Sequence, residues 1–149
     1  MQLVTTMSGK LARHQRRRPI VLVADDDGGA RELFASALPR FGFDVISGSN
    51  TVEALARVPY VLPDIIVTEV SLQRGDPWKE IRSIKSDPTT RNIPIVIVTA
   101  DCDPAVRERS ERQRCAAFVT KPCSPDGLAA TLQQVLDVKA WLEDLREPS

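Results

Sequence analysis

The sequence predicts an α/β fold, a doubly wound parallel sheet of five strands between two layers of helices, in three αβα layers. Short apolar runs alternate five times with longer stretches at helical spacing, which is typical of βαβ units. Three of the runs, IVLVA, IIVT and IVIV, are apolar on both faces, as strands covered by helices on two sides must be. With 149 residues, 42% of them hydrophobic, the chain suits a single domain with an apolar core.

The apolar runs predict the strands, and the stretches between them predict the helices. The expected strands cover residues 20–24, 44–47, 65–68, 94–98 and 116–119. The expected helices cover residues 30–41, 52–58, 77–85, 104–114 and 125–145. Two helix starts are marked by an N-cap acceptor before a proline, namely Asp76 before Pro77 and Ser124 before Pro125. We expect Pro39 to kink or end the last turn of the first helix.

Three regions are expected along the chain. Residues 1–18 lack apolar periodicity and end in three arginines, which predicts a flexible basic arm. Residues 19–138 form the domain, and residues 139–149 extend the last helix by about two turns and end in a tail. An apolar stripe runs along this helix into the extension, so a homodimer seam, a partner groove or packing back onto the domain is expected. Its members are Leu128, Leu132, Val135, Val138, Leu142 and Leu145.

Composition narrows the possible partners and compartments. Twenty basic and twenty acidic residues give a net charge of zero, which argues against nucleic acid and anionic membranes as partners. No apolar run is long enough to span a bilayer, and the polar start does not resemble a signal peptide, so we expect a cytoplasmic protein. The three cysteines lack C-x-x-C spacing, which predicts free thiols.

Polar residues with complementary chemistry follow four of the predicted strands. Three aspartates occupy positions 25–27 after the first strand, and Glu69, Thr99 and Lys121 follow the third, fourth and fifth strands. In an open parallel sheet, these carboxyl ends meet at one crevice. Clustered carboxylates suit Mg²⁺, a lysine neutralises an anion, and a threonine hydroxyl can hydrogen-bond a phosphoryl oxygen. The set therefore predicts a pocket for a magnesium ion and a phosphoryl group.

The stretches IVLVADDD, LPDIIVTE, IPIVIVTA and AFVTKP resemble the response-regulator receiver domain of two-component systems, from residue 19 to about residue 138. The resemblance implies a flavodoxin-like sheet with strand order 2-1-3-4-5. It also implies that Asp25 and Asp26 bind Mg²⁺, that Thr99 and Phe118 are switch residues, and that Lys121 holds the phosphoryl group. In the family, the bond equivalent to Lys121–Pro122 is often cis.

The sequence departs from the family at Glu69, which stands where the resemblance implies a phosphorylated aspartate. Asp64 precedes the third strand, at the wrong end of the sheet, and Asp76 is already a helix-cap candidate. The chain thus resembles an atypical pseudo-receiver. Glu69 either imitates the phosphorylated state or forms a fixed ion pair with Lys121, and both interpretations remain open. The excess negative charge of the pocket favours a bound cation.

We therefore expect a stand-alone receiver-like protein that is not an enzyme. It would act by protein–protein contact with a sensor histidine kinase or with a phosphorelay or output protein, independently of aspartyl phosphorylation. The expected partner face comprises Arg107, Arg109, Arg112, Phe118 and Leu142. Two alternatives are a phosphatase similar to the haloacid dehalogenases that uses Asp25 and Asp27, and an ordinary receiver with an unexpected acceptor.

Overall fold

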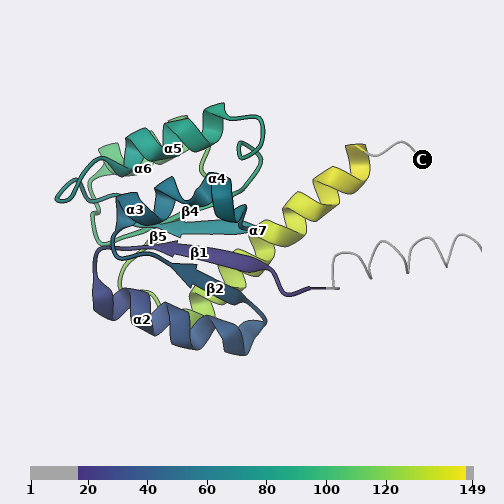
Figure 1. The fold of residues 1–149 in the computed structure, drawn as a ribbon, viewed down its shortest axis with the longest axis horizontal. Coiled ribbons are helices and arrows are strands. Elements are labelled where there is room, and N and C mark those ends of the chain that lie inside the picture. The colour runs from purple at the N-terminus through teal and green to yellow at the C-terminus, as the bar shows by residue number, and fades with distance from the viewer. Residues whose placement is uncertain (1–16, 147–149) are drawn as a thin grey trace, which may run out of the picture.

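The computed structural model describes residues 17–146, and its elements alternate between strands and helices (Figure 1). The strands are β1 (Ile20–Ala24), β2 (Asp44–Ser47), β3 (Ile65–Thr68), β4 (Ile95–Thr99) and β5 (Ala117–Thr120). The helices are α2 (Gly28–Ala37), the 3₁₀ helix η1 (Leu38–Phe41), α3 (Thr51–Ala56), α4 (Val58–Val61), α5 (Pro77–Ser86), α6 (Pro104–Arg112) and α7 (Pro125–Arg146). All strand pairs are parallel, in the order β2-β1-β3-β4-β5, which confirms the predicted fold class.

Each face of the sheet is covered by its own helices, as Figure 1 shows. Alternate residues of a strand point to opposite faces. Leu22 and Ile66 therefore join the core beneath α3, α4 and α5, while Val21 and Val67 join the core against α2 and α7. Because both faces are covered, the central strands β1, β3 and β4 are buried at every position except for Ile20 at the first.

Prolines account for the main differences between the predicted and observed helices. The first predicted helix ends at Ala37 and continues as the 3₁₀ helix η1, with Pro39 at its start, as expected of a proline in a last turn. The second predicted helix is instead two short helices, because the chain turns at Arg57 and α4 begins at Val58 with Pro59 in its first turn. The predicted fourth and fifth strands begin one residue later than expected.

Several local predictions are confirmed. Asp76 accepts hydrogen bonds from the first backbone amides of α5, and the Ser124 hydroxyl accepts one from Gly127 at 3.1 Å. The Lys121–Pro122 peptide bond is cis. The three cysteines are free thiols. Three caps were not predicted: Asp27 caps α2, Asn50 caps α3 and Asp103 caps α6.

The end of the predicted basic arm contacts the folded domain. Residues 1–16 of the arm lie outside the described residues, but Arg17 donates two hydrogen bonds to the carboxylate of Asp64, at 2.6 and 2.8 Å. Asp64 also accepts from the backbone amide of Ile20 at 2.7 Å, so it ties the start of β1 to the start of β3. Arg18 donates to the carbonyl oxygens of Pro39 and Phe43.

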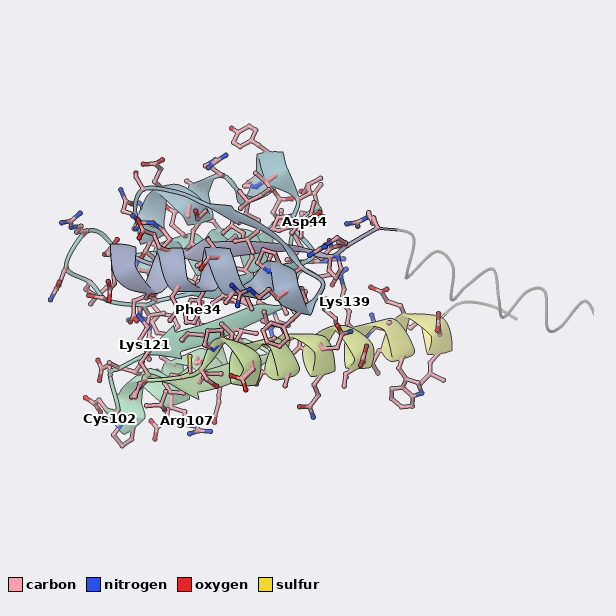
Figure 2. The ribbon with its side chains drawn as sticks, turned by 90° about the horizontal axis from the view of Figure 1, so that it is seen from below. Phe34, Asp44, Cys102, Arg107, Lys121 and Lys139 are labelled. Atoms are coloured by element: carbon pink, nitrogen blue, oxygen red, sulfur yellow. The ribbon has the colours of Figure 1, made fainter. Side chains whose placement is uncertain are left out.

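Helix α7 projects beyond the sheet at the end opposite the strands' carboxyl ends (Figures 1 and 2). The projecting turns carry large apolar side chains with high exposure: Val138 50%, Trp141 60%, Leu142 41% and Leu145 64%. A groove of about 590 Å³ lies between α7 and the starts of β4 and β5. None of the helices within residues 17–146 is both long and apolar enough to cross a membrane.

Candidate functional site

The predicted pocket residues converge at the carboxyl end of the sheet. Asp25 follows β1, Glu69 follows β3, Thr99 ends β4 and Lys121 follows β5. Parallel pairing in the order β1-β3-β4-β5 places these strand ends side by side, and the residues line one groove of about 900 Å³. Figure 2 shows Lys121 at this end of the molecule.

Lys121 bridges two carboxylates at the centre of the pocket. Its ammonium nitrogen lies 2.7 Å from Oδ2 of Asp25 and 3.2 Å from Oε2 of Glu69. All three side chains are largely buried, with 19%, 6% and 12% exposure for Lys121, Asp25 and Glu69. Burial by itself lowers the pKa of Lys121, but the hydrogen bond and charge of Asp25, joined by Glu69, outweigh it and raise the pKa above its ordinary value.

The second oxygen of Glu69 is also engaged. Oε1 accepts the hydroxyl of Thr99 at 2.5 Å and the backbone amide of Val70 at 3.1 Å. Thr99 in turn accepts from the backbone amide of Asp101 at 3.1 Å, which fixes its hydroxyl toward Glu69. Both polar groups that the resemblance assigns to a phosphoryl group therefore contact Glu69.

The three consecutive aspartates have three different environments. Asp25 is buried, and its Oδ1 accepts from the amide of Asp27 at 2.9 Å. Asp26 is half-buried, and its Oδ1 accepts from the amide of Thr51 at 2.8 Å, at the start of α3. Asp27 is exposed and caps α2. The phosphatase alternative needs Asp25 and Asp27 to act together, and this geometry gives it no support.

The oxygen atoms of the pocket are chemically suited to Mg²⁺, but those of Asp25 and Glu69 already have protein partners. Both carboxylate oxygens of Asp25 and both of Glu69 accept hydrogen bonds or ion pairs from protein groups. Within residues 17–146, no three His, Cys, Asp or Glu side chains are grouped so that they could hold a metal ion. Lys121 lies between the two carboxylates that a cation would neutralise. Magnesium binding therefore stays a prediction.

The expected partner face does not form one surface. The guanidinium of Arg107 lies over the ring of Phe118, 5.4 Å from its centroid, and the ring is only partly buried against the core. Arg109 lies instead over Trp78 of α5, at 4.9 Å, and lines a groove with Arg112. Leu142 lies on the projecting part of α7, at the other end of the molecule, where Figure 2 shows Lys139 on the preceding turn.

Sequence reasoning missed two groups that shape the pocket. Arg31 of α2 donates to the backbone carbonyl of Asp25 at 2.7 Å and to that of Ser49 at 3.3 Å, which joins the loops after β1 and β2. The amide of Thr51 holds Asp26. The strand order could have indicated the second contact, because α3 begins beside the carboxyl end of β1. The position of Arg31, one turn into a helix, gave no such signal.

Comparisons with known proteins agree with this geometry. The family model for the response regulator receiver domain matches residues 21–133. Response regulator PleD of Caulobacter vibrioides is 31% identical over 127 residues, which cover 85% of this chain and 28% of PleD. The phosphate regulon transcriptional regulatory protein PhoB of Pseudomonas aeruginosa is 31% identical over 116 residues, 78% of this chain and 51% of PhoB. The chain thus spans about half or less of the length of the curated relatives it matches.

Solved structures show the same fold. The chemotaxis protein CheY4 of Vibrio cholerae has a TM-score of 0.72 at 23% identity, covering 79% of this chain and 98% of that chain. The signal receiver domain of a signal transduction histidine kinase from Syntrophus aciditrophicus has a TM-score of 0.71 at 27% identity, covering 80% and 91%. Given the match of the family model to most of the chain, this protein belongs to the response regulator receiver domain family of two-component signalling.

Proposed function

We propose that this chain is a receiver whose pocket is occupied by Glu69 and which signals through protein–protein contact without aspartyl phosphorylation. One observation carries the proposal: the Thr99 hydroxyl and the Lys121 ammonium both contact the Glu69 carboxylate. The two groups that could bind a phosphoryl group therefore both bind the side chain of Glu69 instead.

The imitation of a phosphoryl group is incomplete in charge. A carboxylate carries one negative charge, whereas a phosphorylated side chain carries about −1.5 to −2 and three acceptor oxygens. The contact with Thr99 supports imitation of the phosphorylated state. The ion pair with Lys121 supports a fixed structural role. Because Glu69 makes both contacts at the same time, the two interpretations are equally compatible with the structure. In either case Glu69 itself is not expected to accept a phosphoryl group.

We infer that Lys121 serves as the resident cation of the pocket. Receiver domains of this family typically bind Mg²⁺ at their acidic pocket, but here the carboxylate oxygens of Asp25 and Glu69 already have protein donors. Hydrogen bonds that satisfy both members of a largely buried ion pair are what such a pair needs to persist. Metal binding to wild type would have to displace the ammonium group.

The partners follow from the family. Receiver domains interact with histidine kinases and output domains, and we propose a sensor histidine kinase or a phosphorelay or output protein as the partner of this chain. The half-buried ring of Phe118, with Arg107 across it, supports a contact surface near the pocket. A cytoplasmic location is consistent with such partners.

The test is intact-mass measurement after incubation with acetyl phosphate and Mg²⁺, on wild type, Glu69→Asp and Glu69→Gln. The aspartate is one methylene shorter, so it leaves room for an acyl phosphate, while the glutamine cannot form one. We expect a phosphoryl adduct on the aspartate variant alone. An adduct on wild type and on Glu69→Gln would reveal an unexpected acceptor and contradict the proposal. Hydrolysis of a generic phosphomonoester, lost on Asp25→Asn, would instead support the phosphatase alternative.

We also propose that the projecting part of α7 forms a parallel seam with a second copy of the chain. Val138, Leu142 and Leu145 recur at spacings of four and three residues, the repeat of a coiled-coil core. Parallel pairing places Arg146 of one copy beside Trp141 of the other, the same type of contact that Arg109 makes with Trp78. Antiparallel pairing would instead bring the basic residues beside the apolar stripe of one helix next to the same basic residues of the other helix.

A further inference from the structure

A second groove, apart from the acidic pocket, is lined almost entirely by cations. It lies between the C-terminal halves of α5 and α6 and has a volume of about 400 Å³. Its lining consists of two uncharged polar residues and five basic ones. The basic residues are Arg82, Lys85, Arg109, Arg112 and Arg114.

These charges are segregated rather than balanced. The acidic residues of α6, Glu108 and Glu111, do not line the groove, and Glu111 instead pairs with Arg107 on the outer face. Among the residues that the structure describes, none of the five cations forms an ion pair with a carboxylate. A basic residue in the last turn complements the dipole of a helix, but one such residue for each helix would suffice.

The groove is unfavourable to the protein on its own. Burial lowers the pKa of Lys85, and the charge of Arg114 lowers it further against the opposing effect of Cys115. Arg114 has a φ of 59°, a left-handed conformation that ends α6, and the backbone amide of Cys115 donates to the carbonyl of Ser110 at 3.0 Å. A bound anion would offset both the crowding of the cations and the burial of the lysine.

The spacing of the cations indicates the shape of that anion. Arg82 and Lys85 are about one turn apart on α5, and Arg109 and Arg112 are about one turn apart on α6. Three residues of a helix rise about 4.5 Å, and long arginine and lysine side chains can spread their charged groups farther apart than their backbones. In an extended chain, side chains on one face repeat about every 6.6 Å. Acidic side chains at every second position of an extended segment are therefore within reach of both rows of flexible cations, and guanidinium groups bind carboxylates through two parallel hydrogen bonds.

We propose that the groove between α5 and α6 binds an extended acidic segment of a partner protein, with Asp or Glu at alternate positions. Arg109 and Arg112 line both this groove and the one at the acidic pocket, so the two grooves adjoin. A segment bound here would lie next to the residues around Glu69. The inference goes beyond the proposed function, because it does not depend on whether Glu69 replaces a phosphorylated aspartate.

The experiment measures fluorescence anisotropy of a labelled peptide of alternating glutamate and serine, titrated with the full chain. We expect binding that weakens as salt is added, and little binding of the matched lysine and serine peptide. The double variant Arg82→Glu/Arg112→Glu should bind at least about tenfold more weakly, because two attractive contacts become repulsive. The neutral variant Arg82→Gln/Arg112→Gln should be intermediate.

The matched control is Arg40→Glu, which reverses an exposed arginine of η1 on the opposite face of the sheet. It should bind the peptide as wild type does, and circular dichroism should show every variant folded. Equal weakening by Arg40→Glu would mean attraction by overall charge alone and would overturn the proposal. So would failure of wild type to bind, or inorganic tripolyphosphate that binds more tightly than the peptide with the same dependence on Arg82 and Arg112.

Discussion

At the scale of single residues, one lysine holds the pocket together. Lys121 is the only cation that pairs with the carboxylates of Asp25 and Glu69 among the residues that the structure describes. The sequence predicted that these groups would meet, because each follows a strand of one parallel sheet. It left open whether Glu69 would turn toward Lys121 or toward a metal ion, since that choice depends on distances of a few ångströms that only packing sets.

Lys121→Met should destabilise the protein by roughly 3 kcal/mol at neutral pH, because it leaves two largely buried carboxylates without a cation. Urea unfolding measures the loss. Because the pKa of Lys121 is raised in the folded state, its contribution is complete below the unfolded value of about 10.4 and is lost as the pH rises through the folded pKa. The more exposed pair of Lys139 with Glu143 gives the control, and Lys139→Met should lower the free energy of unfolding by less than about 1 kcal/mol. An equal loss in the free energy of unfolding for both variants would show that the ion pair of the pocket stabilises the protein no more than a surface pair does.

Asp64→Asn tests the tie between β1 and β3. Burial by itself raises the pKa of Asp64, but Arg17 and the Ile20 amide outweigh it and lower the pKa. The carboxylate therefore stabilises the fold above its unfolded pKa of about 3.9, and this stability is lost as the pH falls through the folded value. We expect a cost of about 1 kcal/mol at neutral pH.

Urea unfolding of wild type and Asp64→Asn should converge in acid, as the pH falls below about 3.9. Asp44→Asn removes a more exposed partner of Arg18 and should change stability less. If the free energies of unfolding of wild type and Asp64→Asn still differed by the same amount in acid, the contribution of the Asp64 charge to stability would be contradicted.

At the scale of elements, caps and prolines determine where helices begin and end. The path of a loop depends instead on how closely it approaches a neighbouring helix. Asp76 and Ser124 were predictable, because the cap and the following proline are adjacent in sequence. The turn at Gly48 was not, because it depends on the distance between the loop after β2 and helix α3. A Cβ at Gly48 would meet Cα and Cβ of Ala54 at 3.1 Å.

Gly48→Ala should destabilise the protein by about 1 to 3 kcal/mol, because backbone atoms of α3 have little freedom to move away. The matched control is Gly28→Ala at the start of α2, where the nearest atom is a flexible arginine tip at 3.5 Å. We expect the control to be neutral or slightly stabilising. Thermal unfolding of both variants measures the difference, and equal melting temperatures would show that the loop after β2 moves freely.

At the scale of the whole molecule, signalling groups gather at one end and an apolar helix projects from the other. Figure 2 shows Lys121 at one end of the molecule and Lys139 farther along, where α7 leaves the sheet. The acidic pocket and the basic groove adjoin through α6, while the α7 seam is remote from both. The proposed partner and the proposed second copy would therefore bind at separate surfaces.

The proposed seam predicts that wild type forms dimers whose fraction rises with concentration, measured by sedimentation equilibrium. Leu142→Asp/Leu145→Asp should shift the protein to monomer without a large loss of stability, because both side chains are already exposed. Tyr60→Asp, at an exposed aromatic residue of α4, should leave the dimer unchanged. A wild type that stays monomeric throughout would refute the seam.

The sequence by itself determined the fold class, the strand positions and the four strand ends that form the pocket. It could do so because buried strands must be apolar on both faces, and because parallel strands bring their carboxyl ends to one edge. Asp25, Glu69, Thr99 and Lys121 were predictable for that reason.

Only the tertiary structure decided which group each of these side chains contacts. It placed Lys121 between two carboxylates, turned Thr99 to Glu69, and separated Leu142 from the arginines of α6. It also gathered Arg82 and Lys85 of α5 beside Arg109, Arg112 and Arg114. Such groupings depend on how two helices pack across a sheet, and the periodicity of each helix fixes only the face that it buries.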